Sequence, residues 1–460
     1  MPGIASGLAA DVRADRTEMG TWGLIVVILS AYSLGAGTYT GIEAVSNGMS
    51  VLREPRVQTG KRTMVYMGTS LAFVVGGLLL VYLLYHVAPV EGKTLNAVLL
   101  EQMSSAWPGW LGKSFVFAAL VSSAALLFIA AQTGFLGGPR VLANMAVDRW
   151  MPTRFATLSD RLVTQNGVLL MGATALVVML STQAAVSILV VLYSINVFVT
   201  FSLSQLGMVR HWWTDRANTP LWKRKLCING FGLLLTSGIL ISLCIVKFFE
   251  GGWATLFVTG LLIWAAFLIK RHYRKTQVRL QRLNDLVATA TMDDGTLKRT
   301  EIPAPIFDQS ARTAIFLVNG FNGLGLHTLL AVMRMFPKNY QNFVFLQVGV
   351  LDAGNFKGAS EVENLREHAR REVERYVAYM KRHGFYAESH FALGTDVVDE
   401  AAKLCEIIGG HFPQAQFFAG QLVFKDESLL TRLLHNHTVF ELQRRLYQHG
   451  RPMLILPIQV

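Results

Sequence analysis

Long apolar stretches separated by short polar connections dominate the first 270 residues of the chain. Crossing a hydrocarbon core of about 30 Å takes about 20 helical residues. Seven stretches meet or approach that length, and they lie near 22–52, 64–86, 115–145, 167–182, 184–208, 230–248 and 253–270. The pattern predicts a transmembrane domain of about seven spans at 21–273, preceded by a polar lead-in at 1–20.

The pattern changes in the C-terminal part, where short apolar runs alternate with helical patterns. The apolar runs lie at 313–320, 342–350, 386–394, 414–423 and 452–460. The helical patterns lie at 326–336, 361–383, 396–410 and 428–449. Such alternation is typical of a parallel α/β sheet. We expect an α/β domain at 313–460, joined by a polar linker or irregular arm at 274–312 that contains two prolines.

The distribution of charged residues predicts on which side of the membrane each part of the chain lies. Apolar residues make up 52% of the chain and charged residues 16%, and the net charge is +12. A soluble domain carries about 25% charged residues. The basic residues of the apolar part gather in alternate connections and after the last span, which indicates topology rather than a nucleic-acid surface. Because Lys and Arg favour the cytoplasmic side, we expect an inner (plasma) membrane protein with an extracellular lead-in and a cytoplasmic α/β domain.

The first span carries glycines and polar residues near its middle. Glycine weakens a helix, and broken backbone at membrane depth is tolerated only against protein or a water-filled cavity. Freed carbonyls of such breaks bind ions or substrates in transporters. A close helix contact through small residues is the alternative. The residues concerned are Gly35, Gly37, Thr38, Tyr39, Thr40, Gly41 and Glu43.

Glu43 of the first span, and Gln132 and Thr133 of the third, each allow two interpretations. Glu43 could stabilise the N-terminus of a second half-helix, or it could couple transport to an ion, as intramembrane carboxylates often do. Gln132 and Thr133 in the third span could line a site. They could equally serve as hydrogen-bonding groups between helices.

Three segments resemble the amino acid–polyamine–organocation superfamily of permeases. TYTGIEAVSNGMSVLREPR (38–56) looks like its sixth helix, and GPRVLANMAVDRWMP (138–152) is similar to the end of its eighth. KFFEGGWATLFVTGLLIWAAFLIKRHY (247–273) resembles the last two helices of the potassium-importing KUP-type branch. The resemblance implies the second inverted repeat of a LeuT-like fold plus two helices. It places Thr38 and Thr40 as oxygen ligands, Tyr39 as a lining ring, and Gln132 and Thr133 as weaker candidates.

The same resemblance implies a gap. Members of the superfamily have twelve helices, and the seven spans here match helices six to twelve. We therefore expect a natural fragment of a longer permease, or a truncated gene model. A half-transporter that needs a partner chain is the alternative.

The C-terminal part resembles the universal stress protein-like α/β fold. The glycines that bind nucleotide phosphates in that fold are missing from 419–441. The turn Gly320-Phe321-Asn322-Gly323-Leu324-Gly325 could present amides to a phosphate, or it could be a simple turn.

Together these features predict secondary transport of potassium or an amino acid, coupled to protons or ions, with a regulatory or dimerising cytoplasmic domain. We expect a small solute or monovalent cation, membrane lipid and a second copy of the chain as partners, and neither nucleic acid nor a cofactor. A membrane-anchored ligand sensor without transport is the alternative. The sequence contains no nucleophile–base set, and its three cysteines show no metal-binding spacing, so an enzyme is not expected.

Overall fold

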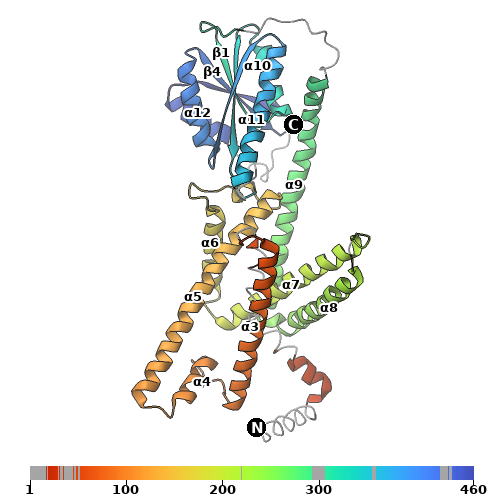
Figure 1. Ribbon diagram of the computed structural model, residues 1–460, viewed down its shortest axis with the longest axis vertical. Helices are drawn as coiled ribbons and strands as arrows, with labels where there is room; N and C mark the ends of the chain where they lie inside the picture. Colours follow the sequence, from red (N-terminus) through yellow and green to blue (C-terminus); the bar gives the residue numbers. More distant parts are fainter. Residues whose placement is uncertain are drawn as a thin grey trace. The chain divides into compact units, whose positions relative to one another are not determined.

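The computed structural model describes residues 17, 19–28, 31, 35, 45, 48–49, 52–218, 220–292, 306–354, 359–424, 434 and 438–459. The chain divides into two compact units. One comprises Met1–Gly137 and Met171–Trp264, and the other comprises Gly138–Leu170 and Ala265–Val460. The first is helical, and the second contains the five-stranded sheet (Figure 1).

Five described helices are long and apolar enough to cross a membrane. In α3 and α5, none of the most apolar window is buried within the protein, so lipid is the medium that suits these surfaces. A sixth helix, α6 (Gln165–Ser181), is shorter, and most of the first predicted span lies outside the described residues. The five are α3 (Arg56–Leu84), α5 (Gly109–Val147), α7 (Val186–Thr214), α8 (Trp222–Val246) and α9 (Trp253–Met292).

The best-packed region of the helical unit joins α7 and α8. Ile195 and Phe198 of α7 are buried together with Leu243 of α8. A short π-helical turn, Phe248–Gly252, connects α8 to α9. A side chain at Gly252 would meet the carbonyl oxygen of Lys247 at 2.6 Å, so this connection requires glycine.

A helix absent from our prediction, α4 (Leu95–Ser104), lies between α3 and α5. The Thr94 side chain caps it by accepting a hydrogen bond from the amide of Ala97. Thr is a favoured residue at this position. Thr94 is therefore a local sequence signal for the start of α4, although the polar residues around it made the helix hard to predict.

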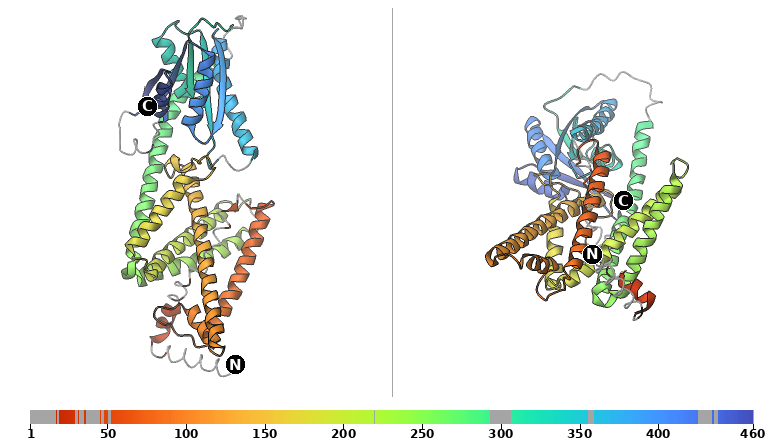
Figure 2. Two further views of the ribbon diagram at one scale, coloured as in Figure 1. Left: turned by 90° about the vertical axis from the view of Figure 1, so that its left-hand side faces the viewer. Right: turned by 60° about the horizontal axis from the view of Figure 1, so that its bottom comes forward.

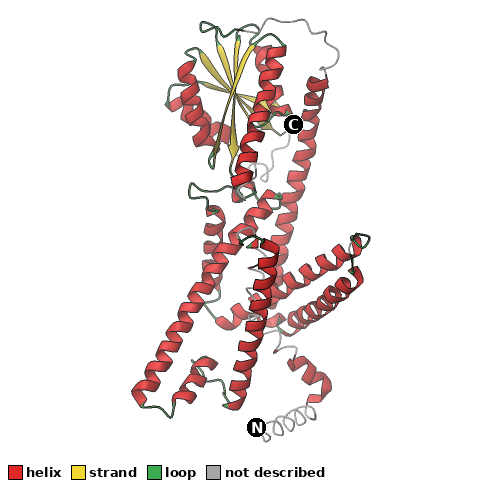
Figure 3. Ribbon diagram, viewed as in Figure 1, coloured by secondary structure: helices red, strands yellow, loops and turns green. Residues whose placement is uncertain are grey.

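The predicted α/β fold is confirmed. The strands are β1 (Thr313–Val318), β2 (Asn342–Val350), β3 (Tyr386–Gly394), β4 (Ala415–Val423) and β5 (Met453–Gln459). They form one parallel sheet in the order β3-β2-β1-β4-β5 (Figure 3). The intervening helices are α10 (Gly323–Met335), α11 (Ala359–Arg382), α12 (Val397–His411) and α14 (Thr438–Gln448).

Helices cover both faces of this sheet (Figure 2). Alternate strand residues point to opposite faces. On one face, Phe316, Phe345 and Phe418 pack with Tyr376 of α11. On the other face, Ile315, Val344 and Phe417 pack with Cys405 of α12 and Leu442 of α14. Burial on both sides explains why the sequences of the inner strands β1 and β2 are almost continuously apolar.

The predicted linker at 274–312 differs from the observed structure, because α9 remains helical to Met292. This helix is 40 residues long, and its last part is polar and rich in Arg, Gln and Leu, which are good helix formers. A change to polar residues shows where the chain leaves an apolar environment. It does not show where the helix ends. The domain boundaries drawn from the sequence remain predictions.

Candidate functional site

Most residues of the predicted membrane site lie outside the described part of the chain. These are Gly37, Thr38, Tyr39, Thr40, Gly41 and Glu43, so their roles stay predictions. Gln132 and Thr133 are described, and both lie exposed on α5. The Thr133 hydroxyl donates to the carbonyl oxygen of Ala130 in its own helix at 2.6 Å, so this contact does not join it to a neighbouring helix.

Other polar groups of the spans are mostly satisfied within their own helices. The hydroxyls of Ser122, Ser194 and Thr200 each donate to a carbonyl one turn earlier. Other hydrogen bonds join two helices. The Thr259 hydroxyl of α9 donates to the Asn196 amide oxygen of α7 at 2.9 Å, and the Tyr82 hydroxyl of α3 donates to the Asn96 amide oxygen of α4. The Thr259–Asn196 pair is the kind of interhelical hydrogen bond that stabilises packed membrane helices.

The α/β domain has a crevice at the point where its strand order reverses. The chain adds β2 and β3 on one side of β1 and then β4 and β5 on the other. Ligands of such folds bind beyond the carboxyl ends of the strands at this point. A cavity of about 420 Å³ lies there, lined mostly by apolar side chains with a few polar groups such as Asn322, Thr328 and Gln421.

Most amides of the glycine turn between β1 and α10 already donate to protein groups. Its first donor, the Phe321 amide, donates to the Glu372 carboxylate at 2.8 Å. The Gly323 amide donates to the Asn284 side chain of α9 at 2.9 Å. The Gly325 amide donates to the Asn322 side chain at 3.0 Å. The phosphate-binding alternative is therefore not supported, because a protein carboxylate already occupies the turn.

Tyr376 of α11 completes this turn. Its hydroxyl accepts from the Asn322 amide at 3.4 Å and donates to the Gly320 carbonyl at 3.0 Å. Burial raises the pKa of this phenol above its ordinary value, because the interior disfavours the charged form. The hydroxyl stays protonated and keeps its donor role.

The carboxyl ends of the strands also contact the loop between α5 and α6. After β2, Asp352 forms an antiparallel bridge with Thr157, and the Ala353 amide donates to the Ala156 carbonyl at 2.9 Å. After β3, the Thr395 hydroxyl donates to the Asp160 carboxylate at 3.3 Å. We call this rim of the sheet, comprising 319–325, 352–354 and 395, the docking edge.

The C-terminal part of α9 contacts the same docking edge. Leu283 and Asn284 pack against Gly323, where an added side-chain carbon would clash with the Leu283 carbonyl. Earlier along α9, the Tyr273 hydroxyl donates to the Leu434 carbonyl at 3.4 Å and accepts from the Thr153 amide at 3.3 Å. The loop, α9 and the α/β domain are thus hydrogen-bonded to one another.

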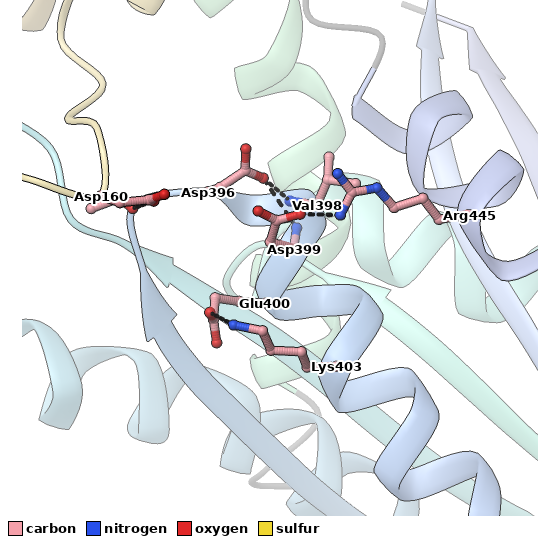
Figure 4. A network of polar contacts seen from close by, with 8 residues as sticks. Asp160, Asp396, Val398, Asp399, Glu400, Lys403 and Arg445 are labelled. Atoms are coloured by element: carbon pink, nitrogen blue, oxygen red, sulfur yellow. Dashed lines mark hydrogen bonds and ion pairs between the residues drawn. The ribbon is translucent and has the colours of Figure 1, made fainter. Parts of the chain in front are cut away.

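A polar network surrounds the N-terminus of α12 beside this rim (Figure 4). The Asp396 carboxylate caps the helix by accepting from the amides of Val398 and Asp399 at 2.7 and 3.1 Å. Asp399 pairs with Arg445, and Glu400 pairs with Lys403. Acidic residues at a helix N-terminus stabilise it, so the cluster is accounted for structurally. The described residues contain no group that could hold a metal ion.

Comparisons with known proteins identify the membrane part. A family model described as amino acid permease matches residues 9–269. The potassium transporter KimA of Bacillus subtilis (strain 168) is 31% identical over 266 residues, which cover 57% of this chain and 42% of that protein. The chain thus spans less than half the length of this curated relative. The match confirms the resemblance to the permease superfamily near its potassium-importing branch, and the chain belongs to the amino acid permease family of multi-pass membrane proteins.

Proposed function

We propose that the membrane helices belong to a secondary transporter that imports potassium, driven by protons or another ion. The observation that carries this proposal is the family match over the whole apolar part, with a relative named as a potassium transporter. An amino acid is the alternative substrate, since oxygen ligands suit an ammonium group as well as a hard cation.

The proposed substrate site is the predicted helix break at Gly37–Gly41. Thr38 and Thr40 would provide hydroxyl or carbonyl oxygens, Tyr39 a lining ring, and Glu43 a carboxylate beside the break. Gln132 and Thr133 would contribute from α5. A broken helix in a transporter is the usual place for such ligands.

A test of this site compares two threonine variants in a potassium-import-deficient host. Thr40→Ala removes a proposed ligand, and we expect at least about a fivefold loss of potassium uptake, as for loss of one hydrogen bond or ligand contact. Thr69→Ala is the matched control, because its hydroxyl is bonded only within α3. Equal uptake by both variants would remove Thr40 from the site.

The α/β domain would regulate this transport from the cytoplasm. The docking edge supports the proposal, since the loop between α5 and α6 and the end of α9 both contact it. The crevice of about 420 Å³ opens at the same rim. A ligand bound there would lie next to the segments that continue into the membrane helices. That the domain also joins two copies of the chain in a dimer stays a prediction.

A ligand sensor without transport is the second candidate, and the same crevice favours it. The two candidates differ in one result. A transporter moves potassium into cells or vesicles, whereas a sensor binds its ligand and moves nothing.

A further inference from the structure

The connection between α7 and α8 carries a dense group of cations and indoles. Between positions 210 and 225 the chain has five Lys or Arg residues and three Trp residues, but one Asp. Four of the five cations are exposed. The two helices pack side by side (Figure 1), so the end of α7 and the start of α8 lie together. The five cations are Arg210, Arg216, Lys223, Arg224 and Lys225.

The length of α7 places this group at the depth of lipid headgroups. The apolar part of α7 begins at Ile188, and Arg210 follows about 33 Å further along at 1.5 Å per residue. The hydrocarbon core of a bilayer is about 30 Å thick, and the headgroup layers extend it to about 40–45 Å. Trp is enriched at this boundary, because its ring is apolar and its N–H is polar.

Indole rings hold some of these cations in place. Lys225 Nζ of α8 lies 4.5 Å from the ring centre of Trp212 of α7, and Arg216 Cζ lies 5.6 Å from that of Trp213. Cations within about 6 Å of an indole face are attracted by the ring. The rings of Trp213 and Trp222 meet edge to face at 6.4 Å and join the two helices. Membrane topology requires only basic residues on one side, and it does not require them to be placed on indoles.

We infer that this hairpin binds the headgroup phosphate of an anionic phospholipid. A guanidinium has several N–H donors that suit phosphate oxygens, and clusters of four or more cations next to a membrane span attract anionic lipid. Leu206 of α7 and Ile228 of α8 are exposed within one or two turns of the cations. They offer an apolar surface to the acyl chains, which a free phosphate ion does not have.

Native mass spectrometry of the purified full chain in detergent tests this site, with phosphatidylglycerol as the probe. We expect phosphatidylglycerol to bind at least about tenfold more tightly than neutral phosphatidylcholine. Arg216→Gln with Lys225→Gln should weaken this binding at least about tenfold. The matched control is Lys61→Gln with Arg62→Gln, which removes two exposed cations near the start of α3 and should leave the affinity unchanged.

A second variant tests the part played by the indoles without any change of charge. Trp213→Leu keeps an apolar side chain but removes the ring beside Arg216, so phosphatidylglycerol should bind about threefold more weakly. Trp213→Phe keeps an aromatic ring, and its affinity should stay closer to that of the wild type.

Four results would overturn the inference. Equal affinity for the two lipids would show that only the acyl chains bind. Equal losses from the two double variants would show a general effect of basic connections, and no loss from either would place the lipid elsewhere. Displacement of phosphatidylglycerol by an equal concentration of inorganic phosphate would indicate a site for the free ion. None of these measurements involves transport, so failure here leaves the proposed transport function untouched.

Discussion

At the scale of single residues, Gly323 is a position where the α/β domain closely approaches α9. Any side chain there would clash with the Leu283 carbonyl of α9. We expect Gly323→Ala to separate the turn from α9 and to destabilise the domain by about 1–3 kcal/mol, as forced strain usually does. Chemical denaturation followed by circular dichroism of the full chain measures this effect.

Gly410→Ala is the control for that variant. Gly410 lies on α12 with nothing within 4 Å of an added side-chain carbon, so alanine should leave the stability unchanged or raise it by about 0.5–1 kcal/mol. Equal effects of the two substitutions would contradict the proposed close contact at Gly323.

Cys405 offers a chemical report on the folding of the domain. Its thiol is fully buried, and burial raises its pKa to about 12. Since the thiolate is the reactive form, we expect no maleimide labelling at pH 7 until denaturant unfolds the domain. A variant that lacks the other two cysteines isolates this thiol.

Ser310→Cys, added to a variant lacking all three native cysteines, is the control for this labelling experiment. Ser310 is exposed, so a cysteine there should label at once. Rapid labelling of Cys405 in the folded chain would argue against the packing of α12 on the sheet.

At the scale of elements, the contact between the α5–α6 loop and the end of β2 can be tested by a disulfide. Thr157 and Asp352 face one another in an antiparallel bridge, and Cα atoms in such pairs lie about 4.5–5.5 Å apart. That separation is within the range for a disulfide. We expect Thr157→Cys with Asp352→Cys to cross-link on mild oxidation, detected as a mobility shift on a non-reducing gel.

The control pair is Thr157→Cys with Ser310→Cys, because Ser310 precedes β1 at the opposite, amino end of the strands. This pair should remain reduced under the same oxidation. If neither pair or both pairs cross-linked, the loop would not dock specifically on the carboxyl edge of the sheet.

The sequence predicts the elements of the α/β domain well because their burial leaves a local signature. β2 is buried on both faces and is a nearly continuous apolar run, and its predicted bounds, 342–350, match the observed ones. The predicted bounds of the half-buried edge strand β3, 386–394, match as well. The polar end of α9 and the short helix α4 were missed. Polarity gives no reliable signal of whether a segment outside an apolar core is helical.

The candidate sites were less predictable, since they depend on residues far apart in the chain. The glycine turn after β1 has the same local sequence whether it binds phosphate or not. The Phe321 amide of this turn donates to the carboxylate of Glu372, which lies 51 residues later in the chain. The bridge between Thr157 and Asp352 likewise joins two segments without any shared pattern. Only the folded chain brings these groups together.

At the scale of the whole molecule, the chain joins a permease domain to an α/β domain. Apolar helices with exposed surfaces explain membrane insertion, and the alternating basic connections predict a cytoplasmic C-terminal domain. The docking edge gives that domain a direct contact with the α5–α6 loop and α9. The proposed regulatory role predicts that cross-linking Thr157→Cys to Asp352→Cys changes the rate of uptake, and reduction should restore that rate.

The most direct test of the central claim is uptake of radiolabelled rubidium into potassium-import-deficient cells. The protein is expressed from its gene together with any coding sequence that precedes it in frame. The account predicts uptake above that of cells with an empty vector, inhibited by excess potassium and unaffected by amino acids. Uptake no greater than that of the empty-vector cells would contradict potassium transport, and so would inhibition by amino acids instead of potassium.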